Sequence, residues 1–187
     1  MKALGIVGSP RKNGNTDTLM KHTLKAIAAE GLETELVRLA DYDIRPCDGC
    51  QVCRQGKPCP IDDDLMTVYR KALASDAVII GAPVYFGSAN SLTKAFLERT
   101  GAIDRPGAGL RGKVGGPLVV ARRAGKTFTF AEIMYWFHIL GFFMPGSSYW
   151  NVAVGREKGE VRKDTEGMET AWNFGKNVAF LVKKLQA

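Results

Sequence analysis

The chain has 187 residues, with 26 Lys and Arg against 19 Asp and Glu, which gives a formal net charge of +7. Hydrophobic residues make up 45% of it and charged residues 24%, a globular rather than disordered composition. The length suits one domain of about 100–200 residues, here 1–187. No apolar run reaches the ~20 residues of a membrane span, and residues 1–8 lack the pattern of a signal peptide. The basic residues are scattered, unlike those of nucleic-acid-binding motifs. We therefore expect a cytoplasmic protein that binds neither membranes nor nucleic acid.

Short apolar runs alternate with segments of helical periodicity along the chain. The expected strands are 2–7, 33–39, 77–83, 113–121 and 149–154. The expected helices are 18–29, 65–74, 91–100, 127–140 and 165–185. Asn15 or Thr16 is expected to cap the first helix and 62–64 the second, and the charged segment 155–164 is expected to be a solvated loop. This alternation predicts an α/β fold, with a parallel sheet covered by helices on both faces.

The loop that joins the first strand to the first helix has the composition of a phosphate site. It reads Gly-Ser-Pro-Arg-Lys-Asn-Gly-Asn-Thr over residues 8–16. Free backbone N–H groups, the partial positive charge of a helix N-terminus and a guanidinium together hold phosphate well. It is not a Walker A loop, because Gly14 is followed by Asn15 rather than Lys. No Gly-x-Gly-x-x-Gly is present, which argues against a tightly bound dinucleotide. The loop could instead be a polar turn that only caps the helix.

Two further loops follow strands of the predicted sheet. Residues 83–88, Pro-Val-Tyr-Phe-Gly-Ser, come after the third strand and carry two aromatic side chains. Residues 121–125, Ala-Arg-Arg-Ala-Gly, close the fourth strand. Ligands of open α/β sheets bind at the carboxyl ends of the strands, so these loops suit a flat heteroaromatic ring. Tyr85 and Phe86 could instead simply pack under the next helix.

Ser-Pro-Arg-x-x-Gly-Asn-Thr after the first strand and Pro-Val-Tyr-Phe-Gly-Ser after the third resemble the flavodoxin-like NADPH-dependent FMN reductase superfamily. The similarity extends to the segment 94–99, Lys-Ala-Phe-Leu-Glu-Arg. The resemblance implies a doubly wound sheet of five parallel strands in the order 2-1-3-4-5, in three α/β/α layers, with FMN at the switch point. It implies three groups of cofactor-binding residues: Ser9, Arg11, Asn13, Gly14, Asn15 and Thr16 at the phosphate, Pro83, Val84, Tyr85, Phe86 and Gly87 along the isoalloxazine, and Arg122 and Gly125 at its pyrimidine side.

All four cysteines fall within thirteen residues, at Cys47, Cys50, Cys53 and Cys59, in the loop 41–61. Their spacing, C-x2-C-x2-C-x5-C-P, is close to the bacterial ferredoxin run that binds an iron–sulfur cluster. Zinc also takes four thiolates, although its sites usually pair two separated C-x2-C units. The same cysteines could form a redox-switched thiol pair or stay as free thiols. The spacing favours a cluster and leaves zinc, a switched pair and free thiols open.

Together with the flavin motifs, this run resembles the iron–sulfur flavoproteins within the superfamily. The resemblance implies a [4Fe-4S] cluster on the four cysteines that passes electrons between a ferredoxin-type donor and FMN, in a homodimer or homotetramer. FMN would then reduce a small acceptor such as an oxygen species or a quinone. The cysteine loop leaves the second strand roughly 10 Å from the third in a 2-1-3 order, so we expect it to share one edge of the sheet with the flavin loops.

Two other functions stay open. One is a cluster-free NAD(P)H-dependent FMN or quinone reductase, in which the nicotinamide, a transient donor, stacks near Tyr85. The other is a non-enzymatic zinc or thiol redox sensor. We expect no catalytic side chain, because the cofactors carry the chemistry. His22 and His138 have no neighbour in sequence that suggests a triad. The aromatic stretch 135–143 is predicted to form core, a subunit interface or a lid over the flavin.

Overall fold

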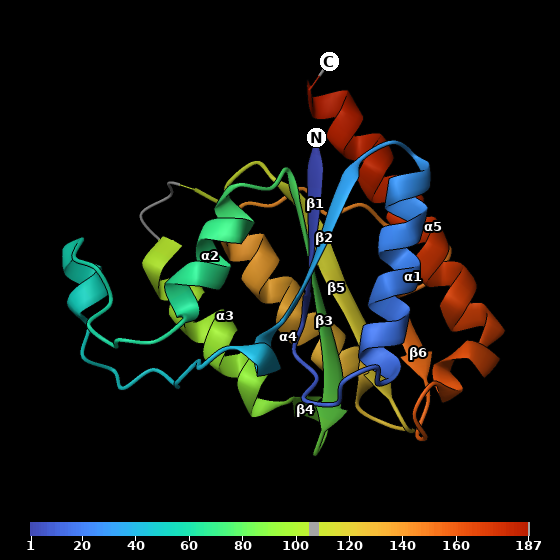
Figure 1. Ribbon diagram of the computed structural model, residues 1–187, viewed down its shortest axis with the longest axis horizontal. Coiled ribbons are helices and arrows are strands. Elements are labelled where there is room, and N and C mark those ends of the chain that lie inside the picture. Colours follow the sequence, from blue (N-terminus) through green and yellow to red (C-terminus); the bar gives the residue numbers. More distant parts are fainter. Residues whose placement is uncertain (105–108, 187) are drawn as a thin grey trace.

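The computed structural model describes residues 1–104 and 109–186. A twisted parallel sheet runs through the middle of it, with helices on both faces (Figure 1). Its strands are β1 (Lys2–Val7), β2 (Glu33–Arg38), β3 (Ala77–Tyr85), β4 (Ser88–Ala89), β5 (Val114–Ala121) and β6 (Val152–Val154). The main strands lie in the order β2-β1-β3-β5-β6, and β4 pairs antiparallel with β3. Without the short β4, which the sequence did not predict, this is the expected order 2-1-3-4-5.

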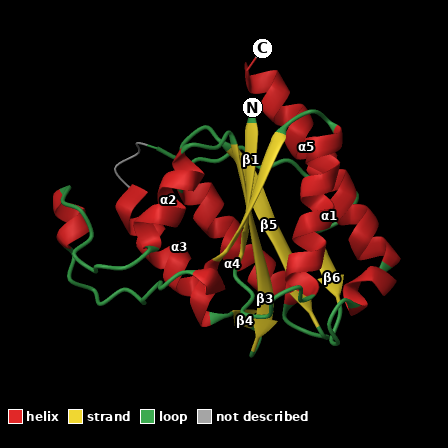
Figure 2. Ribbon diagram, in the orientation of Figure 1, coloured by secondary structure: helices red, strands yellow, loops and turns green. Residues whose placement is uncertain are grey.

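In the described part of the chain, α-helices cover both faces of the sheet (Figure 2). They are α1 (Asn15–Ala29), α2 (Leu65–Leu73), α3 (Ser91–Asp104), α4 (Lys126–Ile139) and α5 (Thr165–Gln186). Short 3-10 turns occur at Leu39–Asp41, Val52–Gln55 and Glu160–Lys163. No helix in the described part of the chain is both long and apolar enough to cross a bilayer.

Two local expectations need correction, those for the cap of α1 and for the segment 155–164. Helix α1 begins at Asn15 with Gly14 as its N-cap, and no side chain caps it. At α2 the predicted cap within 62–64 is confirmed: Asp64 is the N-cap, and the Asp63 side chain accepts from Leu65 N at 3.2 Å. The charged segment 155–164 is not merely solvated, because its 3-10 turn buries Val161 completely in the core.

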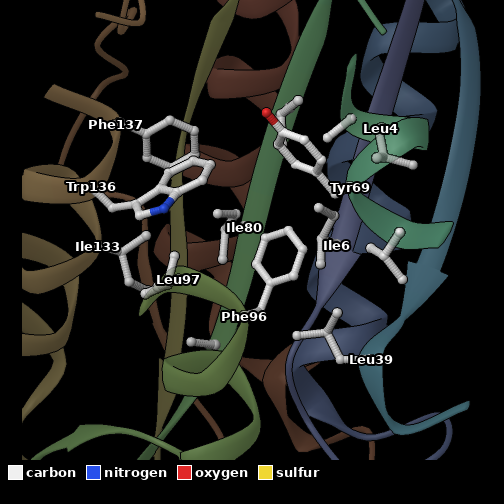
Figure 3. Close-up of a cluster of buried hydrophobic side chains, with 14 of the residues drawn as sticks. Leu4, Ile6, Leu39, Tyr69, Ile80, Phe96, Leu97, Ile133, Trp136 and Phe137 are labelled. Atoms are coloured by element: carbon white, nitrogen blue, oxygen red, sulfur yellow. The ribbon is translucent and has the colours of Figure 1, made fainter. Parts of the chain in front are cut away.

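The core has two layers, one on each face of the sheet. Alternate side chains of a strand point to opposite faces, so Leu4 and Ile6 of β1 face α2, α3 and α4 (Figure 3), while Ala3 and Val7 face α1 and α5. The central strands β1, β3 and β5 are buried on both sides over most of their length, as a parallel sheet between helices requires. The aromatic stretch is divided: the side chains that pack in the first layer are Trp136, Phe137 and Phe142, and those left exposed are Tyr135, Ile139 and Phe143.

Candidate functional site

A cavity of about 280 Å³ lies at the carboxyl ends of β1, β3 and β5. The three loops that were predicted to hold the ligand meet there. Its wall contains Ser9, Arg11, Asn15, Thr16, Pro83, Val84, Tyr85 and Arg122 from the predicted set, together with Val120, Ala121, Gly155 and Arg156. The predicted residues outside this wall are Asn13, Gly14, Phe86, Gly87 and Gly125.

The loop after β1 is folded back to place the start of α1 at the cavity. Gly14 N donates to Arg11 O at 3.0 Å, and Arg11 N donates to Ser9 Oγ at 3.3 Å. Helix α1 starts at the next residue, so its first backbone N–H groups have no partner within the helix and face this end of the cavity. Asn90 Nδ2 holds the loop from the other side by donating to Gly8 O at 2.8 Å. The arrangement suits an anion.

Two of the predicted phosphate residues have other partners. The Asn15 side chain donates to Glu157 O at 2.9 Å and accepts from Val161 N at 3.2 Å. Asn13 lies in the left-handed region with φ of 53°, and its Oδ1 accepts from Lys21 Nζ at 3.0 Å. Asn15 therefore fastens the segment after β6 to the start of α1, and Asn13 ties the loop to the surface of that helix.

Fastening this segment brings Gly155 and Arg156 into the cavity wall, where sequence reasoning did not place them. Arg11 Nη1 donates to Arg156 O at 3.4 Å, which joins the two sides. The sequence did contain a signal for this placement: the segment follows the carboxyl end of β6, so it lies at the same edge of the sheet as the other loops. Arg11 and Arg156 give this end of the cavity two cationic side chains.

The loops after β3 and β5 pack directly on each other. Gly125 has φ of +88°, and a Cβ there would lie 2.8 Å from Val84 Cγ1 and 2.9 Å from Gly87 Cα. Phe86 and Gly87 form the turn into β4 with positive φ, and the Phe86 ring is fully exposed to solvent. Phe86 therefore does not pack under the next helix. Gly87 and Gly125 shape the wall by their close approach, while Tyr85 and Arg122 form part of its surface.

Glu132 of α4 holds the β3–β4 hairpin in place. Its carboxylate accepts from Ala89 N at 3.0 Å, Ser88 Oγ at 2.9 Å and Lys94 Nζ at 2.8 Å. Burial acts to raise the pKa of Glu132, but these hydrogen bonds outweigh it and hold the pKa below its usual value. The charged carboxylate thus fixes the position of one wall of the cavity.

The four cysteines line a separate hollow of about 20 Å³ against Arg99, Ala102 and Ile103 of α3. All four are free thiols. Among the described residues, no three His, Cys, Asp or Glu side chains gather closely enough to hold a metal ion. The four thiols are therefore the right kind of ligand for a metal group and line one hollow. In this arrangement, however, they are not close enough together to bind one metal ion.

The position of this hollow differs from the expectation. The segment with the cysteines extends away from the sheet (teal, at the left of Figure 1) and packs on the second half of α3. Arg99 lies eight residues beyond Ser91, or about 12 Å along the helix at 1.5 Å per residue. The hollow shares no wall residue with the cavity at the strand ends.

A buried ion pair fastens the cysteine segment to the fold. Arg99 and Asp63 are each only 1% exposed, and both guanidinium Nη atoms donate to the carboxylate. Nη1 also donates to Arg45 O at 2.9 Å, and Nη2 to Cys59 Sγ at 3.4 Å. Burial acts to raise the pKa of Asp63, yet the hydrogen bonds from Arg99 and from Arg45 and Leu65 N–H groups keep it below its usual value. Sequence reasoning assigned Asp63 only to a helix cap and missed Arg99.

The sheet order and the cavity at the strand ends define a flavodoxin-like α/β protein. The profile of the NADPH-dependent FMN reductase family matches residues 1–157, and the chain belongs to this family of FMN-dependent oxidoreductases. The predicted family is therefore confirmed.

Similar proteins include an iron-sulfur flavoprotein of Methanocaldococcus jannaschii, which is 40% identical with both chains covered completely. An iron-sulfur flavoprotein of Methanosarcina thermophila is 33% identical over all of this chain and 97% of its own. Among solved structures, RosB with a bound flavin-derived intermediate gives a TM-score of 0.80 at 21% identity, covering 100% of this chain and 80% of that one. At that identity the structural likeness concerns the fold.

Proposed function

We propose that this protein is an electron-transfer flavoprotein with FMN in the cavity at the strand ends and a [4Fe-4S] cluster on Cys47, Cys50, Cys53 and Cys59. Electrons from a ferredoxin-type donor would reach a small acceptor such as a quinone or an oxygen species. One observation supports the binding of FMN: the loop after β1 and the loops after β3 and β5 meet in one cavity. The cluster part is supported by the shared hollow of the four thiols and by the names of the relatives.

The residues of the cavity fit FMN in charge and shape. Arg11, Ser9 and the N-terminus of α1 would bind the phosphate, through charge-assisted and backbone hydrogen bonds. Pro83 to Tyr85 would lie along the ring, and Arg122 would meet its electron-rich edge. The bound flavin supplies the one- and two-electron chemistry, so the chain needs no acid or base of its own. Its residues would orient the ring, and the exposed Tyr85 is part of the cavity wall.

The cysteine segment fits a cluster through its donors and its surroundings. Cys47 and Cys50 are exposed, and the backbone takes left-handed conformations at Gly49, Gln51 and Gly56. Such a segment can bring its thiolates together around a metal centre with little loss of core packing, since its members make few buried contacts. The Arg99 guanidinium beside Cys59 offers positive charge to an anionic thiolate group.

A cluster-free NAD(P)H-dependent FMN reductase is the second candidate. The description of the family that the chain matches favours it. For the first candidate, the net charge of +7 suits an acidic donor protein. We place either activity in the cytoplasm, in a homodimer or homotetramer.

One preparation separates the candidates. Protein purified without oxygen should contain one FMN, four iron atoms and four acid-labile sulfides per chain, and reduced ferredoxin should reduce the flavin faster than NADPH. Protein with FMN but no iron that turns over rapidly with NADPH would establish the cluster-free reductase instead. Colourless protein that retains zinc or free thiols would refute both flavin-based functions.

A further inference from the structure

A buried guanidinium lies in the wall of the hollow that the four cysteines line. The side chain of Arg99 is 1% exposed, and its Nη2 donates to Cys59 Sγ at 3.4 Å. The wall also contains the carboxylate of Asp48, which is exposed and accepts from Cys50 N at 3.1 Å. Water and salt screen an exposed charge much more than a buried one. Of these two charged groups, Arg99 therefore acts on the sulfur atoms with less screening.

The Arg99–Asp63 pair presents its positive side to the thiols. The Asp63 carboxylate is also 1% exposed and accepts from both Nη atoms, but Asp63 is not part of the wall of the hollow. The guanidinium is part of that wall and is hydrogen-bonded to a cysteine. Because the Coulomb energy falls with distance, the nearer positive charge outweighs the carboxylate at the sulfur atoms.

The guanidinium is held in place before any metal group binds. Nη1 donates to Arg45 O at 2.9 Å, two residues before Cys47, while Nη2 donates to Cys59. Arg99 therefore contacts both ends of the cysteine segment. The exposed Cys47 and Cys50 can move toward Cys59 without loss of this contact. A charge that is already fixed in position needs no reorganisation when the charge on the sulfur atoms changes.

We propose that Arg99 is a positioning residue that raises the reduction potential of the cluster on the four thiols, through its hydrogen bond to Cys59 Sγ. This inference rests on the proposed function. On reduction, one electron passes from the donor protein to the cluster, no bond breaks and no proton moves. Hydrogen bonds to sulfur and the net charge around a cluster set its potential. Arg99 stabilises the reduced form, which carries one more negative charge, because its N–H···S bond strengthens with the charge on the acceptor.

The test measures the reduction potential of protein purified without oxygen, with electron paramagnetic resonance to follow the reduced cluster. Arg99→Met should lower the affinity of the cluster for an electron about tenfold, a shift of about 59 mV to more negative potential. Asp63→Asn should shift the potential in the positive direction, because the guanidinium then loses its counter-charge. If the ion pair only supported the fold, removal of either partner would loosen the same segment, and the two variants would shift in the same direction or not at all.

Two further variants make the comparison independent of charge number and of folding. Arg54→Met removes one positive charge from the exposed part of the cysteine segment and should shift the potential less than Arg99→Met. If Arg99→Met does not fold, the double variant Arg99→Met/Asp63→Asn replaces it. Compared with Asp63→Asn, the double variant lacks only the guanidinium, so its potential should be the more negative of the two.

Iron and acid-labile sulfide, measured in the same samples, separate the two ways in which the test can fail. Wild-type protein without iron and sulfide would contradict the cluster part of the proposed function, and this inference with it. If the wild type holds the cluster, equal potentials in all variants would overturn this inference alone. Shifts of the same sign in Arg99→Met and Asp63→Asn would overturn it too, as would a shift in Arg54→Met as large as that in Arg99→Met.

Discussion

The Arg99–Asp63 pair should contribute strongly to stability, and Asp63→Asn tests this directly. The substitution keeps the shape of the side chain but removes the charge opposite a guanidinium that is 1% exposed. Removal of one partner from a buried ion pair typically costs about 3–5 kcal/mol, because it leaves an uncompensated buried charge. The neighbouring cysteine segment is exposed, so water can relax around Arg99. We therefore expect a loss near the lower end, about 3 kcal/mol, in urea unfolding followed by circular dichroism.

The adjacent Asp62→Asn is the matched control, because Asp62 is exposed and its side chain has no described partner. It should change the free energy of unfolding by less than about 0.5 kcal/mol. The double variant Asp63→Asn/Arg99→Met removes both charges and should recover part of the loss. A loss of stability below about 1 kcal/mol in Asp63→Asn would refute the argument. A double variant that loses more stability than Asp63→Asn and Arg99→Met lose in total, when each is made alone, would also refute it.

The pH dependence follows from the same pair. The pKa of Asp63 lies below its usual value in the folded protein, so the carboxylate stabilises the fold above the ordinary Asp pKa of about 3.9. That contribution is lost as the pH falls through the lowered pKa. The stability difference between wild type and Asp63→Asn should therefore shrink below about pH 4. A constant difference across that window would show that Asp63 acts through packing alone.

Three further predictions concern the flavin and cysteine sites. Arg11→Ala should weaken FMN binding by about ten- to a hundredfold in a fluorescence titration, since a charge-assisted hydrogen bond is worth about 1.5–3 kcal/mol; Lys12→Ala, which is not in the cavity wall, is its control. Cys50→Ser should abolish iron binding and leave the FMN content unchanged, measured by metal and flavin analysis. Gly125→Ala should lower both FMN content and Tm, because its Cβ would meet Val84 and Gly87, whereas Gly31→Ala has the same φ of +88° and open space around it.

Each of these has an outcome that contradicts it. Unchanged FMN affinity in Arg11→Ala would mean that the phosphate is bound elsewhere. Iron retained by Cys50→Ser would remove that thiol from the cluster. Equal losses in Gly125→Ala and Gly31→Ala would show that backbone strain, and not the close approach of two loops, decides the effect.

The alternation of apolar runs and helical segments was enough to predict a parallel sheet between helices, and the motifs that resemble the FMN reductase superfamily supplied the strand order. The central strands β1, β3 and β5 are largely apolar runs, so their existence needs no tertiary information. In a parallel sheet all loops that follow strands meet at the carboxyl edge. The resemblance implied Ser9, Arg11, Thr16, Tyr85 and Arg122 as site residues, and these five line one cavity at this edge.

Side-chain partners that lie far apart in the chain could not be predicted. The side-chain amide of Asn15 is hydrogen-bonded to residues about 145 positions away. Its residue type and its place in the loop suited phosphate binding, but its contacts join two parts of the fold. Arg99 belongs to a motif that the sequence marked, yet only the packing of α3 against the loop before α2 pairs it with Asp63. Buried charges are fixed by such long-range pairing, which has no periodic signal in sequence.

The four cysteines show most clearly what the sequence determined and what only the tertiary structure decided. Their spacing by itself determined that they can serve one centre, because short separations let a turning backbone direct several thiols to one place. Only the tertiary structure decided where that place is: a hollow against the second half of α3. The physical reason is that a long loop after a strand is directed by what its anchors contact, here the Arg99–Asp63 pair, and not by the strand it leaves.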